Sequence, residues 1–179
     1  MKIVKRVVLI LIILILIPLV LAAFTKKDYT VEKEIMIQKP KQEVFDYLRH
    51  LKNQDHYSTW AAMDPNMEKT YKGVDGTVGF VSAWKSDNKD VGVGEQEIIA
   101  IKDGERMETE LRFFEPFEAT DKAYVTTEEV SANETKVKWG FEGHMDYPMN
   151  LMLLVMDIEG MIGNDFSTGL TNLKEELEK

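Results

Sequence analysis

The chain has 179 residues, enough for one domain of ordinary size and a short appendage. It has no cysteine, which excludes disulfides, thiolate metal ligands and lipidated cysteines. The net charge is −9, and because three of the 22 basic residues precede residue 7, the chain after residue 24 has 19 basic and 31 acidic residues, a net charge of −12. Such an acidic surface repels nucleic acid, so we expect no nucleic-acid partner.

The N-terminal segment is hydrophobic. Residues 7–24 form an unbroken apolar run of 18 residues with basic residues on both sides. This run is long enough to cross a bilayer, so we predict a transmembrane anchor at residues 1–25 that contacts the membrane through residues 7–24. A cleaved signal peptide is the alternative, because Ala22 and Ala23 are small residues near a possible cleavage point. The apolar region is, however, longer than signal peptides usually have.

The charges beside this run predict its orientation. Three basic side chains and the amino terminus precede the run, whereas two lysines and Asp28 follow it. The positive-inside rule then places the N-terminus in the cytoplasm. We therefore expect a single-pass protein of the cytoplasmic membrane whose domain, residues 26–179, lies on the extracytoplasmic side. The joint from Thr25 to Asp28 is too short to let that domain roam.

The domain is predicted to begin with a strand and two small helices. Tyr29 to Ile37 alternates apolar and charged residues as a strand does. Pro40 then opens a helix, Lys41 to Leu51, whose apolar positions have the helical period. A second short helix or turn contains His56, Tyr57 and Trp60.

Six further strands are expected after Asp64-Pro65, because short extended segments alternate with turn residues. Connections this short join antiparallel neighbours, since a parallel crossover needs a dozen residues or more. The strands are predicted at about Met67–Lys72, Val78–Trp84, Val91–Ile101, Arg106–Phe114, Glu118–Val130 and Thr135–Gly143.

The last predicted element is one long amphipathic helix, Met149 to Leu177. Its apolar stripe is too wide for a helix that stands alone, so it must lie against the sheet. Its three glycines indicate either close backbone approach or room left open. Methionine is adaptable in shape, so the first half could line a cavity or pack as solid core. The methionines in or beside that half are Met145, Met149, Met152, Met156 and Met161.

This order of elements resembles the helix-grip fold of the START-like, or Bet v 1-like (SRPBCC), superfamily, which includes polyketide cyclase/dehydrase and lipid-transport proteins. The resemblance covers Tyr29 to Leu177. It is carried by the opening strand followed by Lys39-Pro40-Lys41-Gln42-Glu43-Val44-Phe45-Asp46-Tyr47-Leu48, by Trp60, and by the Met-rich terminal helix. Asp157 together with Met161-Ile162-Gly163-Asn164-Asp165-Phe166 is similar to membrane-anchored bacterial members of the group.

The resemblance implies an α+β fold, in which a curved antiparallel sheet of about seven strands wraps around a long C-terminal helix. Two small helices follow the first strand, and one transmembrane helix precedes the domain. It also implies an apolar cavity between sheet and helix that holds a small hydrophobic ligand, lipid-like or polyketide-like. For each residue expected on the cavity wall, packing in a solid core is the alternative. The expected wall residues are Trp60, Phe80, Trp84, Phe113, Phe117, Trp139, Phe141, Met152, Met156 and Phe166.

Two other functions are weighed against a binding or carrier domain. A cyclase, dehydratase or hydrolase acting in the same cavity would use His144 or Asp157, although each residue has an ordinary structural explanation and we assign no catalytic residue. An envelope interaction module would have its cavity filled by side chains. No motif for a metal, nucleotide or catalytic triad is present, so we predict no metal and no cofactor, and nothing in the sequence specifies an oligomeric state.

A cluster of acidic residues is expected outside the cavity. Glu95 and Glu97 alternate on one predicted strand, and Glu108 and Glu110 alternate on the next. Each pair therefore points to a single face of the sheet. A solvated outer face is the predicted environment of all four.

Overall fold

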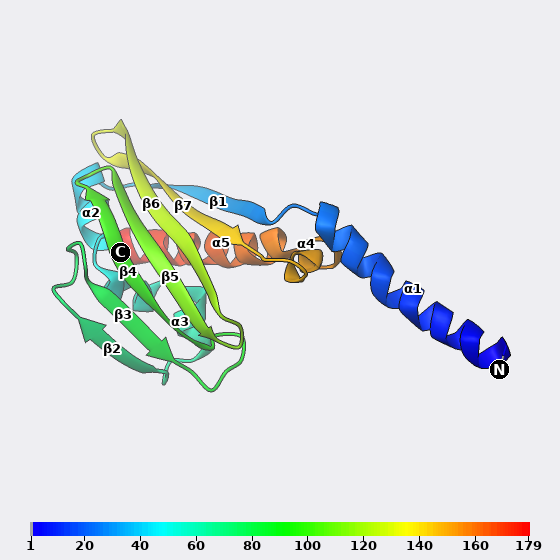
Figure 1. Cartoon of the computed structure of the whole chain (residues 1–179). Coiled ribbons are helices and arrows are strands. Elements are labelled where there is room, and N and C mark those ends of the chain that lie inside the picture. The colour runs from blue at the N-terminus through cyan, green and yellow to red at the C-terminus, as the bar shows by residue number, and fades with distance from the viewer. Residues whose placement is uncertain (1) are drawn as a thin grey trace.

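The computed structural model describes residues 2–179 and has the predicted α+β fold (Figure 1). A curved antiparallel sheet lies against one long helix, α5 (Ile158–Leu177). Residue 1 of the predicted anchor lies outside the described residues. The seven strands are β1 (Asp28–Ile37), β2 (Glu68–Lys72), β3 (Val81–Lys85), β4 (Val93–Lys102), β5 (Arg106–Glu115), β6 (Ala119–Ser131) and β7 (Glu134–His144).

The strand order is β1-β7-β6-β5-β4-β3-β2, so consecutive strands pair except at β1, which pairs with β7. The chain therefore crosses from one edge of the sheet to the other between β1 and β2. This crossing contains α2 (Lys41–Leu48), the 3-10 helix η1 (Leu51–His56) and α3 (Thr59–Met63). The first helix is shorter than predicted, because the backbone is extended at His50 (φ −90°, ψ 109°).

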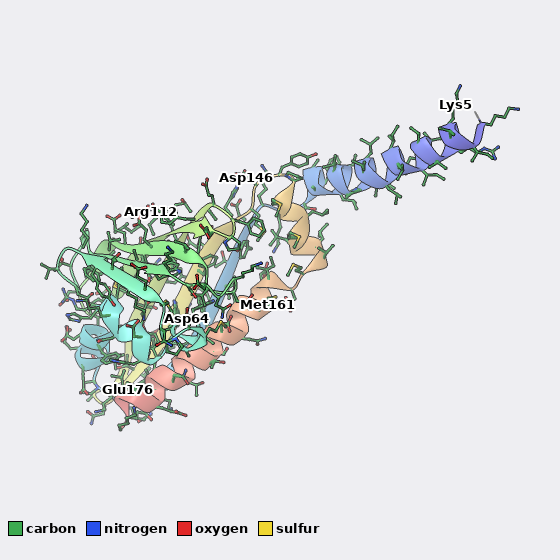
Figure 2. The ribbon with its side chains drawn as sticks, turned by 90° about the horizontal axis from the view of Figure 1, so that it is seen from below. Lys5, Asp64, Arg112, Asp146, Met161 and Glu176 are labelled. Carbon is green, nitrogen blue, oxygen red and sulfur yellow. The ribbon has the colours of Figure 1, made fainter. Side chains whose placement is uncertain are left out.

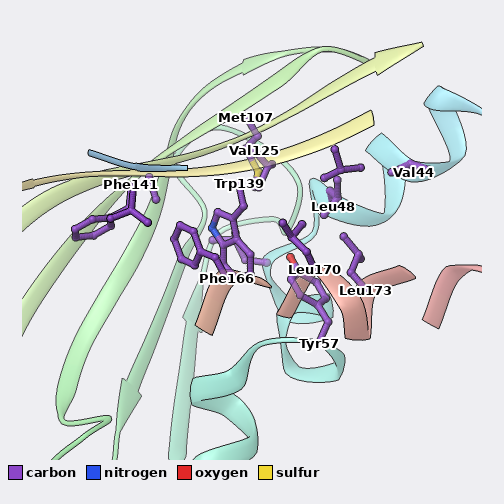
Figure 3. Packing of buried hydrophobic residues seen from close by; sticks show 14 of the residues in the cluster. Val44, Leu48, Tyr57, Met107, Val125, Trp139, Phe141, Phe166, Leu170 and Leu173 are labelled. Atoms are coloured by element: carbon purple, nitrogen blue, oxygen red, sulfur yellow. The ribbon is translucent and has the colours of Figure 1, made fainter. Parts of the chain in front are cut away.

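The concave face of the sheet packs on α5 around two aromatic rings. Trp139 of β7 stacks on Phe166 of α5 with ring centroids 4.4 Å apart and an interplanar angle of 9° (Figure 3). The edge of Tyr57 meets Trp139 at 5.7 Å. Gly169 permits this close approach, because a Cβ added there would lie 2.9 Å from the indole of Trp139. Of the two sequence-based explanations for helix glycines, close backbone approach therefore applies at Gly169.

The long terminal helix predicted from Met149 to Leu177 is not continuous. The chain forms the 3-10 turn η2 (Met149–Leu151) and the single turn α4 (Met152–Val155), and then becomes extended at Met156 (φ −122°, ψ 140°). Asp157 starts a new helix, because its Oδ1 accepts a hydrogen bond from the backbone N–H of Gly160 at 3.0 Å. An aspartate at the N-cap satisfies a backbone N–H that the first turn leaves without a partner.

The acidic cluster lies on the outer face of the sheet, as predicted, and a cation sits at its centre. The guanidinium of Arg112 contacts Glu95 at 2.6 Å, Glu97 at 2.7 Å and Glu110 at 2.5 Å. Glu95 and Arg112 are opposite each other in the pairing of β4 and β5, so the strand register brings their side chains together. The cluster is therefore an ion-pair network, in which part of the acidic charge is neutralised locally.

Helix α1 (Lys2–Phe24) extends away from the rest of the molecule (Figure 1). Within residues 2–179 it is the one helix long and apolar enough to cross a membrane, a property that a signal sequence shares. Its side chains are almost all exposed, whereas Ala22 is buried where the helix meets the domain.

Filling the space at Gly169 tests the packing of α5 on the sheet. We expect Gly169→Val to lower the free energy of unfolding by about 1–3 kcal/mol, because the branched side chain would overlap Trp139 and the carbonyl oxygen of Tyr57. Chemical denaturation of the full chain in mild detergent, followed by tryptophan fluorescence, measures the change. Thr171→Val, at an exposed position of the same helix, is the control. Equal stability of the two variants would contradict close packing at Gly169.

Candidate ligand-binding site

A cavity of about 390 Å³ lies between the concave face of the sheet, α3 and α5. Its size is within the range of small-molecule sites, about 300–1,000 Å³. The inward-pointing residues of every strand contribute to its wall, because alternate residues of a strand share one face. Seven of the ten residues expected on this wall do line it: Trp60, Trp84, Phe113, Phe117, Trp139, Phe141 and Phe166.

The other three predicted wall residues lie elsewhere. Phe80 is a core residue, 1% exposed, and the exposed Tyr71 stacks on it with ring centroids 6.1 Å apart. Met152 and Met156 lie before the break in the terminal helix, so they do not follow α5 under the sheet. The part of the Met-rich segment that precedes Asp157 is therefore not a cavity wall, in contrast to the sequence-based prediction.

Aromatic rings shape two opposite sides of the cavity. On the side of α5, the Trp60 ring meets Trp139 edge-on at 6.4 Å and Phe166 edge-on at 6.0 Å. On the side of β3 and β5, Trp84 meets Phe113 at 6.0 Å and an angle of 74°. Edge-to-face pairs of this kind hold rings in fixed orientations. Both groups of rings line the cavity and make much of its wall apolar.

Polar residues of the wall were missed by the sequence analysis. Gln96 donates a hydrogen bond to the hydroxyl oxygen of Thr109 at 2.9 Å, and Lys69 pairs with Asp55 at 2.6 Å. Asp121 lies on the wall and is only 7% exposed. The alternation within β6 was the available signal, because Asp121 shares a face with Ala123 and Val125.

Asp121 and Tyr29 form the most unusual polar pair of the cavity. Burial raises the pKa of the Asp121 carboxyl, although one of its oxygens accepts the backbone N–H of His144 at 2.9 Å. Burial, together with the negative charge of Asp121, raises the pKa of Tyr29 to about 12. The Tyr29 hydroxyl is therefore protonated at neutral pH and is available as a donor to a polar group of a ligand.

Neither residue weighed as a catalytic group lies on the cavity wall. The imidazole of His144 is held outside, with Nδ1 2.6 Å from Asp28 Oδ1 and Nε2 3.4 Å from Asp146 Oδ1. Hydrogen bonds to these two carboxylates raise the pKa of His144, and the bond to Asp28 has the larger effect. Asp157 is the N-cap of α5. Within residues 2–179, no group of three histidine, aspartate or glutamate residues is arranged to hold a metal ion.

The open side of the cavity is bordered by two loops, residues 86–92 and 115–118. Both contribute wall residues, and Phe117 in the second loop is 71% exposed. The strand register places both loops at the end of the sheet where β1 begins. Phe113 is opposite Ala119, and Lys122 is opposite Glu142. We take these exposed wall residues to mark the cavity mouth. They lie at the end of the sheet where β1 begins, and α1 emerges next to the start of β1 (Figure 1).

The fold and its cavity define a class: the chain has the helix-grip fold of the START-like, or Bet v 1-like, superfamily. Solved structures establish this likeness at low sequence identity. Norcoclaurine synthase from Thalictrum flavum, in complex with dopamine and hydroxybenzaldehyde, is 10% identical over 87% of this chain and 88% of its own, with a TM-score of 0.63. No family model matches the sequence, and no curated protein does.

Two further structures have the same fold. Ara h 8.0201 is 14% identical and covers 84% of this chain and 97% of its own, with a TM-score of 0.57. The Aha1 dimer from Colwellia psychrerythraea is 13% identical over 84% of this chain and 96% of its own, also with a TM-score of 0.57. Proteins with this fold differ widely in function, so the likeness establishes architecture alone.

The environment of Asp121 predicts a pH-dependent effect on stability. Because its pKa is raised on folding, stability is lost as the pH rises from the unfolded value, about 3.9, through the folded value. Asp121→Asn removes this ionisation and keeps an oxygen acceptor for the backbone N–H of His144. We therefore expect the variant to melt at a higher temperature than the wild type at pH 7, with the difference vanishing near pH 3.

Thermal melts of the full chain in mild detergent at both pH values measure this effect. The control is Asp87→Asn, in an exposed part of the loop 86–92, which should leave the melting temperature unchanged at both pH values. A lower melting temperature for Asp121→Asn at pH 7 would show that the Asp121 carboxylate stabilises the fold instead of opposing it.

Proposed function

We propose that this chain is a membrane-anchored binding or carrier domain for a small hydrophobic molecule, lipid-like or polyketide-like. The observation that supports this function is the cavity of about 390 Å³ under α5, whose wall is mostly aromatic and aliphatic. A filled interaction module would instead have side chains in this space. Apolar walls with a few positioned polar groups are typical of small-molecule sites.

The polar groups of the wall indicate how such a ligand would be oriented. Asp121 and Tyr29 lie at the end of the sheet that carries the mouth, whereas the Trp60 and Phe166 rings lie on α3 and α5. A ligand with an apolar body and one polar group would place the body among the rings and the polar group at Asp121 and Tyr29. The norcoclaurine synthase structure, in complex with dopamine and hydroxybenzaldehyde, is a precedent for small aromatic ligands in this fold.

The proposed anchor would keep the cavity next to a store of apolar molecules. Helix α1 contributes the span, and the short joint after it holds the domain at the bilayer surface. Tethering raises the effective concentration of membrane-dissolved ligand at the cavity mouth without any new contact. A freely diffusing carrier would instead have to collect its ligand from water.

Blocking the cavity tests the binding function. Ala123 lies on the inner face of β6 and lines the cavity, so Ala123→Phe fills part of it. We expect the wild-type chain, purified from cells in native nanodiscs, to retain a specific apolar molecule that Ala123→Phe loses. Organic extraction and mass spectrometry identify the molecule. Lipids around the anchor are the background, and they should be the same in both samples.

Thr120→Phe is the matched control, because Thr120 is exposed on the outer face of the same strand. It adds the same ring without entering the cavity, so it should retain the molecule at the wild-type level. Identical extracts from the wild type, Ala123→Phe and Thr120→Phe would argue against a bound cargo and favour an interaction module.

An enzyme acting in the same cavity is the second candidate, and Asp121 is the observation that favours it. A carboxyl whose pKa is raised by burial, on the wall of an apolar cavity, is a reasonable general acid or base. Once a cargo is identified, its conversion by the wild type and by Asp121→Asn distinguishes the two functions. Loss of conversion with retained binding would identify an enzyme, whereas an unchanged cargo in both proteins would identify a carrier.

The proposed orientation places the domain outside the cytoplasmic membrane, since basic residues are enriched before the apolar run of residues 7–24. Ala132→Cys provides a single thiol in the exposed β6–β7 turn, because the chain has no other cysteine. We expect a membrane-impermeant maleimide to label this thiol in intact cells as completely as in lysed cells. Labelling only after lysis would place the domain in the cytoplasm.

A further inference from the structure

Next to the end of α1, the domain carries a hydrophobic surface that its fold does not use. We call it the α4 patch and define it by five exposed side chains, whose relative exposures run from 40% at Met156 to 69% at Val155. Exposed apolar side chains gathered in this way mark sites of contact with a partner or a membrane. The five residues are Met149, Leu154, Val155, Met156 and Met161.

The sequence of the α4 patch is unusual for a surface segment. Met149 to Met156 reads Met-Asn-Leu-Met-Leu-Leu-Val-Met and contains no charged residue, in a chain of which 30% is charged. Its one polar residue, Asn150, is fully buried. The apolar side chains therefore face solvent while the polar one faces the protein, which is the reverse of an ordinary surface turn.

The buried Asn150 fixes this segment to the end of α1. Its side-chain Nδ2 donates to the carbonyl oxygens of Ala22 at 2.7 Å and Thr25 at 3.0 Å. Ala22 is in the last turn of α1 and Thr25 follows the helix, so Asn150 satisfies carbonyl groups that the end of a helix leaves without a full set of helical partners. A second link is the ion pair between Lys26 Nζ and Glu159 Oε1 at 2.5 Å. The segment of η2 and α4 therefore lies beside the end of α1 (Figure 1).

The length of α1 then sets the depth of the patch in a bilayer. The 18 apolar residues from Val7 to Phe24 span about 27 Å as a helix, close to the hydrocarbon thickness of about 30 Å. The whole run is needed to cross, so Ala22 and Phe24 lie at the hydrocarbon boundary. Asn150, bonded to Ala22, lies at that boundary too, and the exposed side chains beside it reach the headgroup and upper acyl region.

We infer that the α4 patch is a second membrane contact, in which its five exposed side chains insert into the bilayer interface beside α1. This inference rests on the proposed anchoring by α1. Tyr147, which is 47% exposed, precedes the patch, and tyrosine favours the interfacial region of a membrane. Figure 2 shows Met161 on α5 on the side of the domain from which α1 emerges, with Lys5 near the far end of α1.

Such a contact fixes how the cavity faces the membrane. One helix alone leaves the domain free to rotate about the α1 axis and to tilt. A second, hydrophobic contact removes part of that freedom. It also turns the end of the sheet that carries the loops 86–92 and 115–118 toward the bilayer, and the exposed Phe117 and Phe114 lie in or beside the second loop. An apolar ligand then passes between bilayer and cavity with little exposure to water.

Depth-dependent fluorescence quenching tests this contact in the full chain. Single-cysteine variants Leu154→Cys and Met161→Cys, labelled with an environment-sensitive fluorophore, are reconstituted into vesicles that contain lipids spin-labelled high on the acyl chain. We expect a blue-shifted emission and strong quenching at both positions. Ala132→Cys, in the turn at the opposite end of the sheet, is the control that should be neither shifted nor quenched.

Leu14→Cys, in the middle of α1, separates this inference from the proposed anchor. Quenching of the Leu14 probe by lipids spin-labelled near the acyl terminus, with the 154 and 161 probes as exposed to water as the 132 probe, would overturn the second contact and leave the anchor intact. Blue-shifted but unquenched 154 and 161 probes would also overturn it, and would point to a second protein chain on the patch. An unquenched Leu14 probe would overturn the anchor, and the second contact with it.

Discussion

The face-to-face contact between Trp139 and Phe166 is the interaction on which the arrangement of this domain depends. With ring centroids 4.4 Å apart, it joins β7, the strand next to the sheet edge β1, to the middle of α5 and so sets the position of the helix beneath the strands. Gly169, one turn further along, lets the backbone of α5 come close enough for this stacking. On one side of the contact the core is solid, with Leu170 and Leu173 fully buried, and on the other side the cavity opens. One aromatic pair therefore serves as both core and cavity wall.

The sequence predicted the sheet well, because strand alternation and turn residues are local signals. All seven strands lie within a few residues of their predicted positions, and the inward side chains of Trp84, Phe113 and Phe141 follow from the period of two. The terminal helix was predicted less well, because the period of its apolar residues does not reveal that a single side chain caps a helix within the stretch. Asp157 accepts a hydrogen bond from the backbone N–H of Gly160 and starts α5 there. The residues before Asp157 therefore do not continue the axis of α5. Met152 and Met156 consequently do not line the cavity.

The polar residues of the cavity could be predicted only in part, since their environment depends on strands far apart in the sequence. Alternation alone places Asp121 on the inner face of β6. Its burial, however, depends on strands that pair over long sequence distances, and its partner is the backbone N–H of His144 in β7. The sequence indicated His144 as a possible catalytic residue, but Asp28 and Asp146 hold its ring outside the cavity. The backbone N–H of His144 therefore binds a residue of the cavity wall, whereas its side chain forms ion pairs at the surface.

The break at Met156 and the buried Asn150 together explain why an apolar segment interrupts the polar surface of this domain. A continuous helix would have kept Met149 to Met156 on the axis of α5, whereas the extended backbone at Met156 lets this segment take another direction. Hydrogen bonds from Asn150 to Ala22 and Thr25 hold it beside the end of α1, with several of its apolar side chains exposed. Burial of these side chains in a bilayer would recover about 25 cal/mol for each Å² of apolar surface removed from water. If the proposed membrane contact of the α4 patch forms, the same break would also turn the loops 86–92 and 115–118 toward the bilayer.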